Sequence, residues 1–360
     1  MPKKRICFIA QFPPPMHGLS KAVETLYNSE LKNEFTFEKV DITNNKRFLY
    51  NLWLIFRSNA DLFYFTISQT KGGNLRDLIV FSLLRRQHKK CLIHLHGGYY
   101  RQLVDKDLPD WQRKANYKAI SHLEGAIVLG ESLKPIFQGM IDDGKIFVVP
   151  NCVDDEYLMS DEEFEKKISS IDERPIKHVL YLSNFIRSKG YPEVLEMAKK
   201  EKERVDNGGE RKLHFDFAGR FFEDSEKQFF FDYIKENQLD DYVTYHGIVG
   251  GDEKRTLLKK SDVFVLLTRY PNEGQPISIL EAMGNGMVIV TTDHAGIPDI
   301  VKDGVNGIVV CNDQNAGDIL DRMRSIDADI IARNNRESVC QDYRENRYLA
   351  KLQSIFRGIN

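Results

Sequence analysis

The stretch from Val263 to Thr292 reads VFVLLTRYPNEGQPISILEAMGNGMVIVTT, and it decides the fold that we expect for this chain. Its apolar, β-branched ends, at 263–267 and 287–292, are typical of buried strands. Between them, residues 277–283 have the composition of a short helix, which Pro276 precedes and the tripeptide GNG follows. A strand, a helix and a second strand in this order indicate two parallel strands joined by a crossover helix.

The same alternation extends through both halves of the sequence. We expect strands at 6–10, 35–40, 61–66, 91–96, 125–130 and 145–150 in the first half, and at 178–183, 213–219, 242–247, 263–267, 287–292 and 307–310 in the second. Helical periodicity lies between them, as at 21–31, 75–86, 191–203 and 226–237. This pattern predicts an α/β protein with two doubly wound parallel sheets.

The length of the chain indicates two domains. Its 360 residues exceed the roughly 250–300 that one hydrophobic core supports. The acidic stretch 154–173 lacks apolar periodicity, so we place the boundary there. We expect Rossmann-like domains over 1–165 and 166–338, with a C-terminal helix in 339–360 that packs back toward the first domain. Ligands of doubly wound sheets bind beyond the carboxyl ends of the strands, so we expect the site in the cleft between the two lobes.

Composition excludes several classes of protein. The hydrophobic content of 42% and charged content of 29% are those of a soluble globular protein. The five cysteines are scattered without a CxxC pair, which indicates neither a disulfide framework nor a zinc site and favours a cytoplasmic protein. No apolar run approaches the ~18 residues of a membrane span. Residues 1–150 contain 22 Lys and Arg against 14 Asp and Glu, so the first lobe is expected to face an anionic partner.

The first loop of interest is QFPPPMHGLS, residues 11–20. Gly18 would let the backbone approach a ligand, and the following helix offers free amides to an anion. An ordinary loop stiffened by proline is an equally good interpretation. The chain contains no GxGxxG fingerprint, which argues against a dinucleotide-binding domain.

The second loop lies in HLHGGYY, residues 94–100, where two histidines share one face of a strand. His96 is at the strand end, and the two glycines after it leave room for a ligand, so we expect it to form a hydrogen bond in the site. We interpret His94 as a core histidine. Zinc binding is not indicated, because no third ligand follows at a recognisable spacing.

The third loop lies in YLSNFIRSKGYPEVLEMA, residues 181–198. Arg187 and Lys189 follow a strand, and cations at this place suit a phosphate or diphosphate. The alternative is that both are solvated surface charges.

The fourth loop leads into the helix of the opening stretch. Glu273 stands in the loop, and Pro276 is expected at the first helical position, so that amides on either side, including that of Ile277, point toward an oxygen-rich ligand. Glu281 lies a little over one turn into the helix, where its carboxylate could accept two hydrogen bonds from a vicinal diol. The alternative is a capping glutamate followed by a surface glutamate.

Residues 246–310 resemble the donor-binding half of the retaining glycosyltransferases of the GT4 type, which have the GT-B fold of two facing Rossmann-like domains. The motif that carries the resemblance is the pair Glu273 and Glu281, in the family's E-x7-E spacing and strand-loop-helix setting. The EAM that contains Glu281, the later GIPDIV and the DGxNG turn add to it. The resemblance is dense over 178–310 and sparse over the first lobe.

The resemblance implies roles for individual residues. Glu273 and the amides of Gly274 and Gln275 would hold the donor hexose, and Glu281 the ribose hydroxyls. Lys189 would bind the diphosphate and Gly18 a phosphate, while His96 would approach the donor sugar and the backbone of Ile248 and Val249 would meet the base. We thus expect Glu273, His96 and Lys189 to be catalytic, and His17, Gly97 and Tyr99 to lie on the acceptor side.

Two positions depart from the family pattern. Its arginine before the diphosphate lysine falls on Asn184, so a phosphate cation is absent unless Arg187 replaces it. Its glycine within the E-x7-E loop is Pro276, which lacks an amide donor. Both departures bear on the identity of the donor more than on the reaction.

The function that we expect is transfer of a hexosyl group from a UDP- or GDP-linked sugar to a hydroxyl of a saccharide acceptor, with retention of configuration, in bacterial capsule, exopolysaccharide or lipopolysaccharide synthesis. No cofactor and no metal are expected, because Lys189, Arg187 and the helix amides would stabilise the charge of the leaving diphosphate. The alternatives are a nucleotide-sugar epimerase on the same fold and a non-catalytic nucleotide-sugar-binding partner. Nucleic acid explains the basic first lobe less well, because no recognised motif accompanies it.

Two segments of the first lobe mix cations with large apolar residues, KRFLYNLWLIFR at 46–57 and RDLIVFSLLRRQHKK at 76–90. Such segments suit peripheral docking on the inner face of the cytoplasmic membrane, where an acceptor linked to polyprenyl diphosphate could reside. Buried helices with charged ends are an alternative interpretation.

Overall fold

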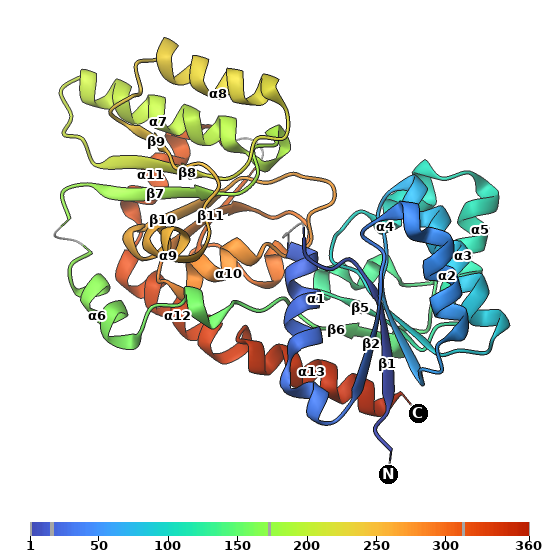
Figure 1. Cartoon of the computed structure of the whole chain (residues 1–360). Coiled ribbons are helices and arrows are strands. Elements are labelled where there is room, and N and C mark those ends of the chain that lie inside the picture. The colour runs from blue at the N-terminus through green and yellow to red at the C-terminus, as the bar shows by residue number, and fades with distance from the viewer. Residues whose placement is uncertain (1, 15–17, 172–173, 312–313, 360) are drawn as a thin grey trace. The chain divides into compact units, whose positions relative to one another are not determined.

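The computed structural model of the chain describes residues 2–14, 18–171, 174–311 and 314–359 (Figure 1). It divides into two compact units. The first comprises Met1–Asn151, Asn272–Gln275 and Asn346–Asn360, and the second Cys152–Pro271 and Pro276–Glu345. The continuous N-terminal part of the first unit therefore ends at Asn151, whereas the sequence led us to expect a boundary at residue 165.

The first unit contains a six-stranded parallel sheet with the order β2-β1-β3-β4-β5-β6. Its strands are β1 (Arg5–Ala10), β2 (Thr36–Asp41), β3 (Leu62–Thr66), β4 (Cys91–His94), β5 (Gly125–Val128) and β6 (Ile146–Val148). The strand order reverses between β1 and β3, the point of a doubly wound sheet beyond whose carboxyl strand ends ligands generally bind.

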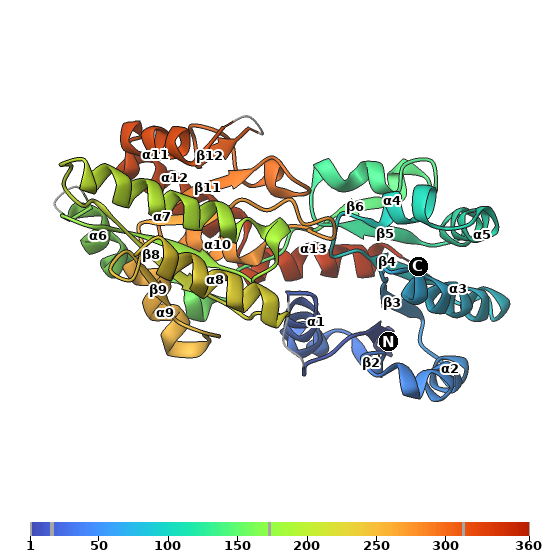
Figure 2. The same ribbon diagram turned by 90° about the horizontal axis from the view of Figure 1, so that it is seen from above.

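Helices cover both faces of this sheet. They are α1 (Gly18–Asn28), α2 (Phe48–Arg57), α3 (Lys71–Arg86), the single turn α4 (Tyr100–Gln102), α5 (Asp110–Ile120) and α13 (Glu345–Gly358). Helices α2, α3 and α5 lie side by side on one face, and α1 and α13 on the other (Figures 1 and 2). Phe356 anchors the C-terminal helix α13. Its ring packs edge-to-face with the rings of Phe35 and Tyr64, at centroid-to-centroid distances of 5.7 and 6.0 Å.

The second unit contains another six-stranded parallel sheet, with the order β12-β11-β10-β7-β8-β9. Its strands are β7 (Lys177–Leu182), β8 (Leu213–Ala218), β9 (Val243–Tyr245), β10 (Val263–Leu266), β11 (Val288–Thr292) and β12 (Gly307–Val310). All twelve strands expected from the sequence are thus present, with ends within two residues of the expected ones. In this sheet the order reverses between β7 and β10.

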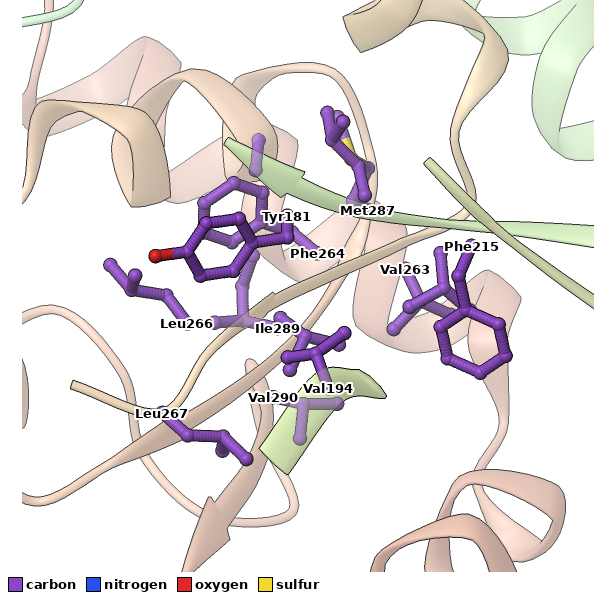
Figure 3. Close-up of a cluster of buried hydrophobic side chains, with 14 of the residues drawn as sticks. Tyr181, Val194, Phe215, Val263, Phe264, Leu266, Leu267, Met287, Ile289 and Val290 are labelled. Atoms are coloured by element: carbon purple, nitrogen blue, oxygen red, sulfur yellow. The ribbon is translucent and has the colours of Figure 1, made fainter. Parts of the chain in front are cut away.

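Helices also cover both faces of the second sheet: α7 (Tyr191–Asp206), α8 (Asp224–Glu236) and α11 (Ala316–Ser325) lie on one face, and α9 (Gly251–Lys260), α10 (Ile277–Gly284) and α12 (Ala328–Asp342) on the other (Figure 1). The core between these layers is apolar, with Tyr181, Val194, Phe264 and Ile289 fully buried (Figure 3). The short central strands are buried on both faces, which explains their continuous apolar runs.

The acidic stretch 154–173, in which we placed the domain boundary, contains helix α6 (Asp161–Ser169). Its start is a capping box, in which the Ser160 hydroxyl accepts from the Glu163 amide at 3.2 Å and the Glu163 carboxylate accepts from the Ser160 amide at 2.9 Å. A capping box stabilises a helix that has only a few apolar residues. This helix belongs to the second unit.

Candidate functional site

The expected site residues divide between the two units. The first unit contains Gly18, His96, Gly97, Tyr99, Glu273, Gly274 and Gln275. The second contains Asn184, Arg187, Lys189, Ile248, Val249, Pro276, Ile277 and Glu281. His17 lies outside the described residues.

The loop segment Asn272–Gln275 is built into the first unit by the side chain of Gln275. The Asn151 amide N–H donates to Gln275 Oε1 at 2.8 Å, and Asn151 Nδ2 donates to the Gln275 carbonyl at 2.8 Å. Gln275 Nε2 in turn donates to the Leu129 carbonyl at 3.2 Å. Gln275 is only 3% exposed, so these three hydrogen bonds replace water for groups that would otherwise be buried unsatisfied.

Two glycines allow this segment to lie against the loop after β4. A Cβ on Gly274 would stand 2.6 Å from the His96 carbonyl oxygen, and a Cβ on Gly97 would stand 2.7 Å from the Asn272 carbonyl oxygen. Both distances are too short for any other residue type without movement of the backbone. His96 and Glu273, which are far apart in the sequence, therefore lie on two segments in direct contact.

The structure corrects our interpretation of Gly97. We expected the glycines after His96 to leave room for a ligand, but the space beside Gly97 is filled by Gln69 and by the Asn272 carbonyl. Gln69 Oε1 also accepts from the Tyr99 amide at 2.6 Å, and the Tyr99 hydroxyl donates to Asp107 at 2.7 Å. The hydrogen bond to Asp107 raises the pKa of Tyr99.

His94 lies fully buried behind His96, as we expected of a core histidine. Its Nδ1 is 2.5 Å from the Tyr64 hydroxyl, and its ring centroid is 4.0 Å from that of His96. Burial, together with the neighbouring His96, holds the pKa of His94 well below its usual value. The ring of His96 thus packs against the ring of a neutral His94. The sequence did not predict this contact.

In the second unit, the two candidate loops follow β7 and β10, the strands between which the order reverses. The loop after β7 forms a short 3₁₀ turn (Arg187–Lys189) that ends at Gly190 with φ of +82°. A Cβ on Gly190 would stand 2.6 Å from the Leu267 carbonyl oxygen, so both the left-handed φ and the close approach require glycine. The Arg269 amide donates to the Ser188 carbonyl at 2.6 Å, which ties the two loops together.

The two cations of this turn differ in their surroundings. The half-buried Lys189 has its Nζ 5.2 Å from the centroid of the Tyr270 ring. Arg187 Nε donates to Glu226 at 2.9 Å, and its guanidinium lies 4.3 Å from the centroid of the Phe229 ring. The hydrogen bond to Glu226 raises the pKa of Arg187. Arg187 could therefore bind a phosphate only after leaving this ion pair.

Helix α10 begins at Ile277, and Pro276 is its N-cap rather than its first helical residue, so our expectation was wrong by one position. Glu281 is 3% exposed, and its Oε1 accepts from Lys254 Nζ at 2.6 Å. Lys254 comes from helix α9 and lies 4.0 Å from the centroid of the Tyr157 ring. We did not predict this lysine, although the helical pattern of GGDEKRTLLKK could have placed it on an inward face.

The loop after β9 contains the residues expected near the base. Ile248 is 70% exposed, and Val249 packs against the core of the second unit. The residue before Gly247 is His246, whose Nε2 lies 2.7 Å from Oδ1 of Asp216.

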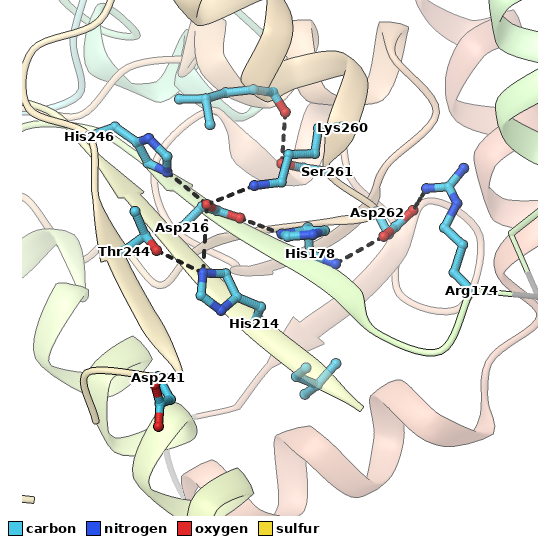
Figure 4. A network of polar contacts seen from close by, with 12 residues as sticks. Arg174, His178, His214, Asp216, Asp241, Thr244, His246, Lys260, Ser261 and Asp262 are labelled. Atoms are coloured by element: carbon cyan, nitrogen blue, oxygen red, sulfur yellow. Dashed lines mark hydrogen bonds and ion pairs between the residues drawn. The ribbon is translucent and has the colours of Figure 1, made fainter. Parts of the chain in front are cut away.

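Asp216 is the centre of a buried polar network (Figure 4). Its Oδ2 is 2.7 Å from His178 Nδ1, and Lys260 Nζ donates to Oδ1 at 3.2 Å. Burial opposes the ionisation of Asp216, but hydrogen bonds with His178 and His246 and the charge of Lys260 outweigh it, so the pKa of Asp216 lies well below its usual value. This network anchors the start of the loop that contains Ile248.

No group of three His, Cys, Asp or Glu side chains among the described residues is arranged to hold a metal ion. No helix in the same ranges combines the length and the hydropathy of a membrane-spanning segment.

Comparison with solved structures identifies the fold. The HepE protein of Anabaena, solved in complex with UDP, superposes with a TM-score of 0.74 over 98% of this chain and 99% of that protein, at 14% sequence identity. Solved glycosyltransferases with the GT-B architecture are thus the structural neighbours, and the expected GT-B fold is confirmed.

Comparison of sequences identifies the family. The "Putative colanic acid biosynthesis glycosyltransferase WcaL" of Salmonella typhimurium is 35% identical over 136 residues, which are 35% of this chain and 33% of that protein. The "Amylovoran biosynthesis glycosyltransferase AmsK" of Erwinia amylovora is 31% identical over 104 residues, 27% of this chain and 26% of that protein. The chain thus matches a third or less of the length of these relatives. Residues 161–339 match the family profile "Glycosyl transferases group 1". These residues, just under half of the chain, thus form a domain of the glycosyl transferases group 1 family.

Proposed function

We propose that the protein transfers a hexosyl group from a nucleoside diphosphate sugar to a hydroxyl of a saccharide acceptor during synthesis of a bacterial surface polysaccharide. The observation that carries the proposal is the match of residues 161–339 to a glycosyltransferase family. The matched region includes the loops after β7 and β10 and also Glu281. The names of WcaL and AmsK, which refer to colanic acid and amylovoran, support a polysaccharide product. The fold similarity to a protein solved with UDP supports a UDP-linked donor, with GDP as the second candidate.

We assign the donor contacts as follows. Glu273 and the amides of Gly274 and Gln275 bind the hexose hydroxyls, and Glu281 binds the ribose diol. The orientation of the Glu281 carboxylate is supported by its ion pair with Lys254. A carboxylate held in this way accepts two hydrogen bonds from adjacent hydroxyls without a large loss of side-chain entropy.

The departing diphosphate gains negative charge as the glycosidic bond breaks. We assign its stabilisation to Lys189 and to the amides at the start of helix α10, where the helix dipole is positive. We further propose that the acceptor hydroxyl attacks from the face that the diphosphate leaves, so that the anomeric configuration is retained. His96 lies on the segment that contacts the Glu273 loop, which supports a role beside the reacting sugar.

These chain groups supply the positive charge that the leaving group needs, and we propose that the reaction is independent of metal ions. Activity that persists in EDTA would agree with this proposal. Activity that vanishes in EDTA and returns with Mg²⁺ or Mn²⁺ would contradict it.

We propose that the acceptor is linked to a lipid diphosphate and that the protein works at the inner face of the cytoplasmic membrane. The excess of eight positive charges in residues 1–150, from 22 Lys and Arg and 14 Asp and Glu, supports an anionic surface as a partner.

The donor can be identified by thermal stabilisation with UDP, GDP, ADP and their sugars. A ligand that binds only the folded state stabilises the protein by mass action, by about 2.7 kcal/mol at a hundredfold excess over Kd, and so raises its melting temperature. The stabilising sugar nucleotide is then incubated with a membrane-lipid extract, and NMR of the product gives the anomeric configuration. Retention of the donor's configuration supports the proposal, and inversion contradicts it.

The same assay separates the two alternatives. Epimerised donor in the absence of any acceptor would favour an epimerase. Nucleotide binding without turnover of any donor would favour a non-catalytic partner.

A further inference from the structure

Large apolar side chains are exposed on one face of the first unit. The described residues of this kind on helices α2, α3 and α5 are Leu49, Tyr50, Trp53, Phe56, Leu75, Ile79 and Trp111, with exposed fractions from 42% to 80%. Helix α2 is therefore not the buried helix with charged ends that we considered as an alternative. Isolated exposed apolar residues are common, but a cluster of this size on neighbouring helices indicates a binding surface.

The cluster surrounds a cavity, which we call the α2–α3–α5 groove. It has a volume of about 560 Å³ and is lined by Leu52, Trp53, Phe56, Leu78, Ile79 and Leu83, among others. Its lining is almost wholly aliphatic and aromatic, with Ser82 and Arg86 as the polar members. The volume lies within the range of small-ligand pockets, and the lining suits an apolar chain rather than a sugar.

Both tryptophans of the chain line this groove, Trp53 from α2 and Trp111 from α5. They are 50% and 59% exposed. Tryptophan is enriched where an apolar phase meets water, because its ring is apolar and its indole N–H still finds a polar partner.

Cations surround the same groove. The guanidinium of Arg47 lies 5.0 Å from the centroid of the Tyr50 ring, and that of Arg57 lies 5.4 Å from the centroid of the Trp53 ring. Arg86 lines the groove directly. Within the described parts of the chain, none of these three arginines forms a salt bridge.

The local sequence contains few acids to oppose these charges. Residues 46–90 include nine Lys and Arg but two Asp and Glu, Asp61 and Asp77, a net charge of 9 − 2 = +7. Asp77 is buried, and its Oδ1 accepts from Arg76 at 2.8 Å. The face thus combines an apolar groove with a strongly positive border.

We propose that the α2–α3–α5 groove is a membrane-docking site that inserts Trp53, Phe56 and Trp111 among the acyl chains of an anionic bilayer and takes one chain into the groove. The arginines at its border then lie at the level of the lipid phosphates. The inference deepens the proposed function, and it rests on that function only for the lipid-linked acceptor.

The charge pattern favours a bilayer over other occupants. A second copy of this chain would bring a face of the same positive charge against the groove, and like charges across an interface oppose association. A soluble apolar ligand would fill the groove but leave Leu49 and Tyr50 exposed and the arginines without an anion. An anionic bilayer satisfies both the apolar and the cationic parts of the surface.

The experiment uses the protein's own fluorescence, because its two tryptophans both lie on the proposed surface. The full chain is mixed with vesicles of equimolar phosphatidylcholine and phosphatidylglycerol, and with vesicles of phosphatidylcholine alone. We expect a blue shift of the emission with the anionic vesicles, quenching of that emission when the acyl chains are brominated, and co-sedimentation of the protein. Salt should weaken this binding, because its attraction is partly electrostatic.

Two matched pairs of variants test the residues. Phe56→Ser, at a 57% exposed position of α2, is compared with Ile330→Ser, at a 56% exposed position of α12. Arg86→Glu is compared with Lys235→Glu, an exposed cation of α8. Each groove variant should weaken vesicle binding by roughly fivefold or more, on the basis of about 1 kcal/mol per basic residue and the loss of a half-buried aromatic ring. The control variants should bind as the wild type does.

Three outcomes would overturn the inference. The first is no blue shift, no quenching and no co-sedimentation with anionic vesicles. The second is equal weakening by the groove variants and their controls. The third is a dimer in solution with shielded tryptophans and no vesicle binding, which would assign the groove to a second copy.

Failure of the inference differs from failure of the proposed function. If the docking site is wrong, Phe56→Ser still transfers sugar to a membrane-lipid extract in detergent as the wild type does. If the function is wrong, vesicle binding persists while no sugar nucleotide is turned over.

Discussion

Gly274→Ala tests how the Glu273 loop is held in the first unit. The added methyl carbon would stand 2.6 Å from the His96 carbonyl oxygen and 2.9 Å from Leu129 Cδ1. The leucine methyl can move, but the carbonyl belongs to the backbone, so the two segments must separate by about 0.4 Å to reach a contact of 3.0 Å. That separation strains the three hydrogen bonds of Gln275 at the next position.

The expected cost follows from these contacts. Overpacking of a rigid site costs about 1–3 kcal/mol, and each weakened hydrogen bond adds up to about 1 kcal/mol. We expect a loss of roughly 2–3 kcal/mol, which would lower the Tm of a unit of this size by roughly 5–10 °C. Because the shift moves Glu273 relative to His96, kcat should fall by roughly tenfold to a hundredfold.

Gly72→Ala is the matched control, since a Cβ there meets nothing within 4 Å and the residue lies in the first turn of α3. The Tm of the Gly72→Ala protein should equal that of the wild type or exceed it slightly. Differential scanning calorimetry and a transfer assay give the two readouts. A Gly274→Ala variant with the Tm and kcat of the wild type would refute the close packing that we describe.

The remaining predictions concern buried ionisable groups. His94→Gln should reduce the loss of folding stability below pH 6.5. The pKa of His94 is lower in the folded than in the unfolded protein, so the wild type loses up to about 1.4 kcal/mol of stability per pH unit as the pH falls below 6.5. Urea unfolding of both proteins at several pH values measures this difference. Asp216→Asn should cost about 3 kcal/mol at neutral pH and reduce the loss of stability in acid, because the depressed carboxyl pKa of the wild type contributes stability that is complete above the unfolded value of about 3.9 and is lost as the pH falls from there toward the folded pKa. A variant as stable as the wild type in chemical denaturation would argue against the network. Lys254→Met should weaken binding of the nucleotide by about tenfold in calorimetric titration, because Glu281 loses its ion pair with this lysine. Lys259→Met, which removes a more exposed ion pair on the same helix, should not weaken it.

The periodicity of the sequence predicted both sheets because each strand is a short apolar run bounded by turn residues, a local property. It also predicted that the loops after β7 and β10 matter, since ligand-binding loops follow strands in a doubly wound sheet. The sequence did not predict helix α6 within 154–173, because this helix is polar and its start depends on the capping box of Ser160 and Glu163 rather than on apolar periodicity.

The contacts that hold the candidate site could not be predicted in the same way. Gln275 with Asn151, and Glu281 with Lys254, are pairs whose members are far apart in the sequence, and nothing in one partner's neighbourhood specifies the other. Gly97 was misinterpreted for the same reason: its missing side chain signals a close approach, but the sequence does not say whether a ligand or another segment approaches.

We assign Glu273 to the donor sugar and Glu281 to the nucleotide. The decisive measurement is of kcat and of the Kd for the nucleoside diphosphate in Glu273→Ala and Glu281→Ala. We predict that Glu273→Ala lowers kcat by roughly a hundredfold or more while its Kd stays within about threefold of the wild type. Glu281→Ala should raise Kd by about tenfold or more, because a hydrogen-bonded diol loses its acceptor. A Glu273→Ala variant that loses nucleotide binding in proportion to activity, or that turns over sugar at the wild-type rate, would contradict the account.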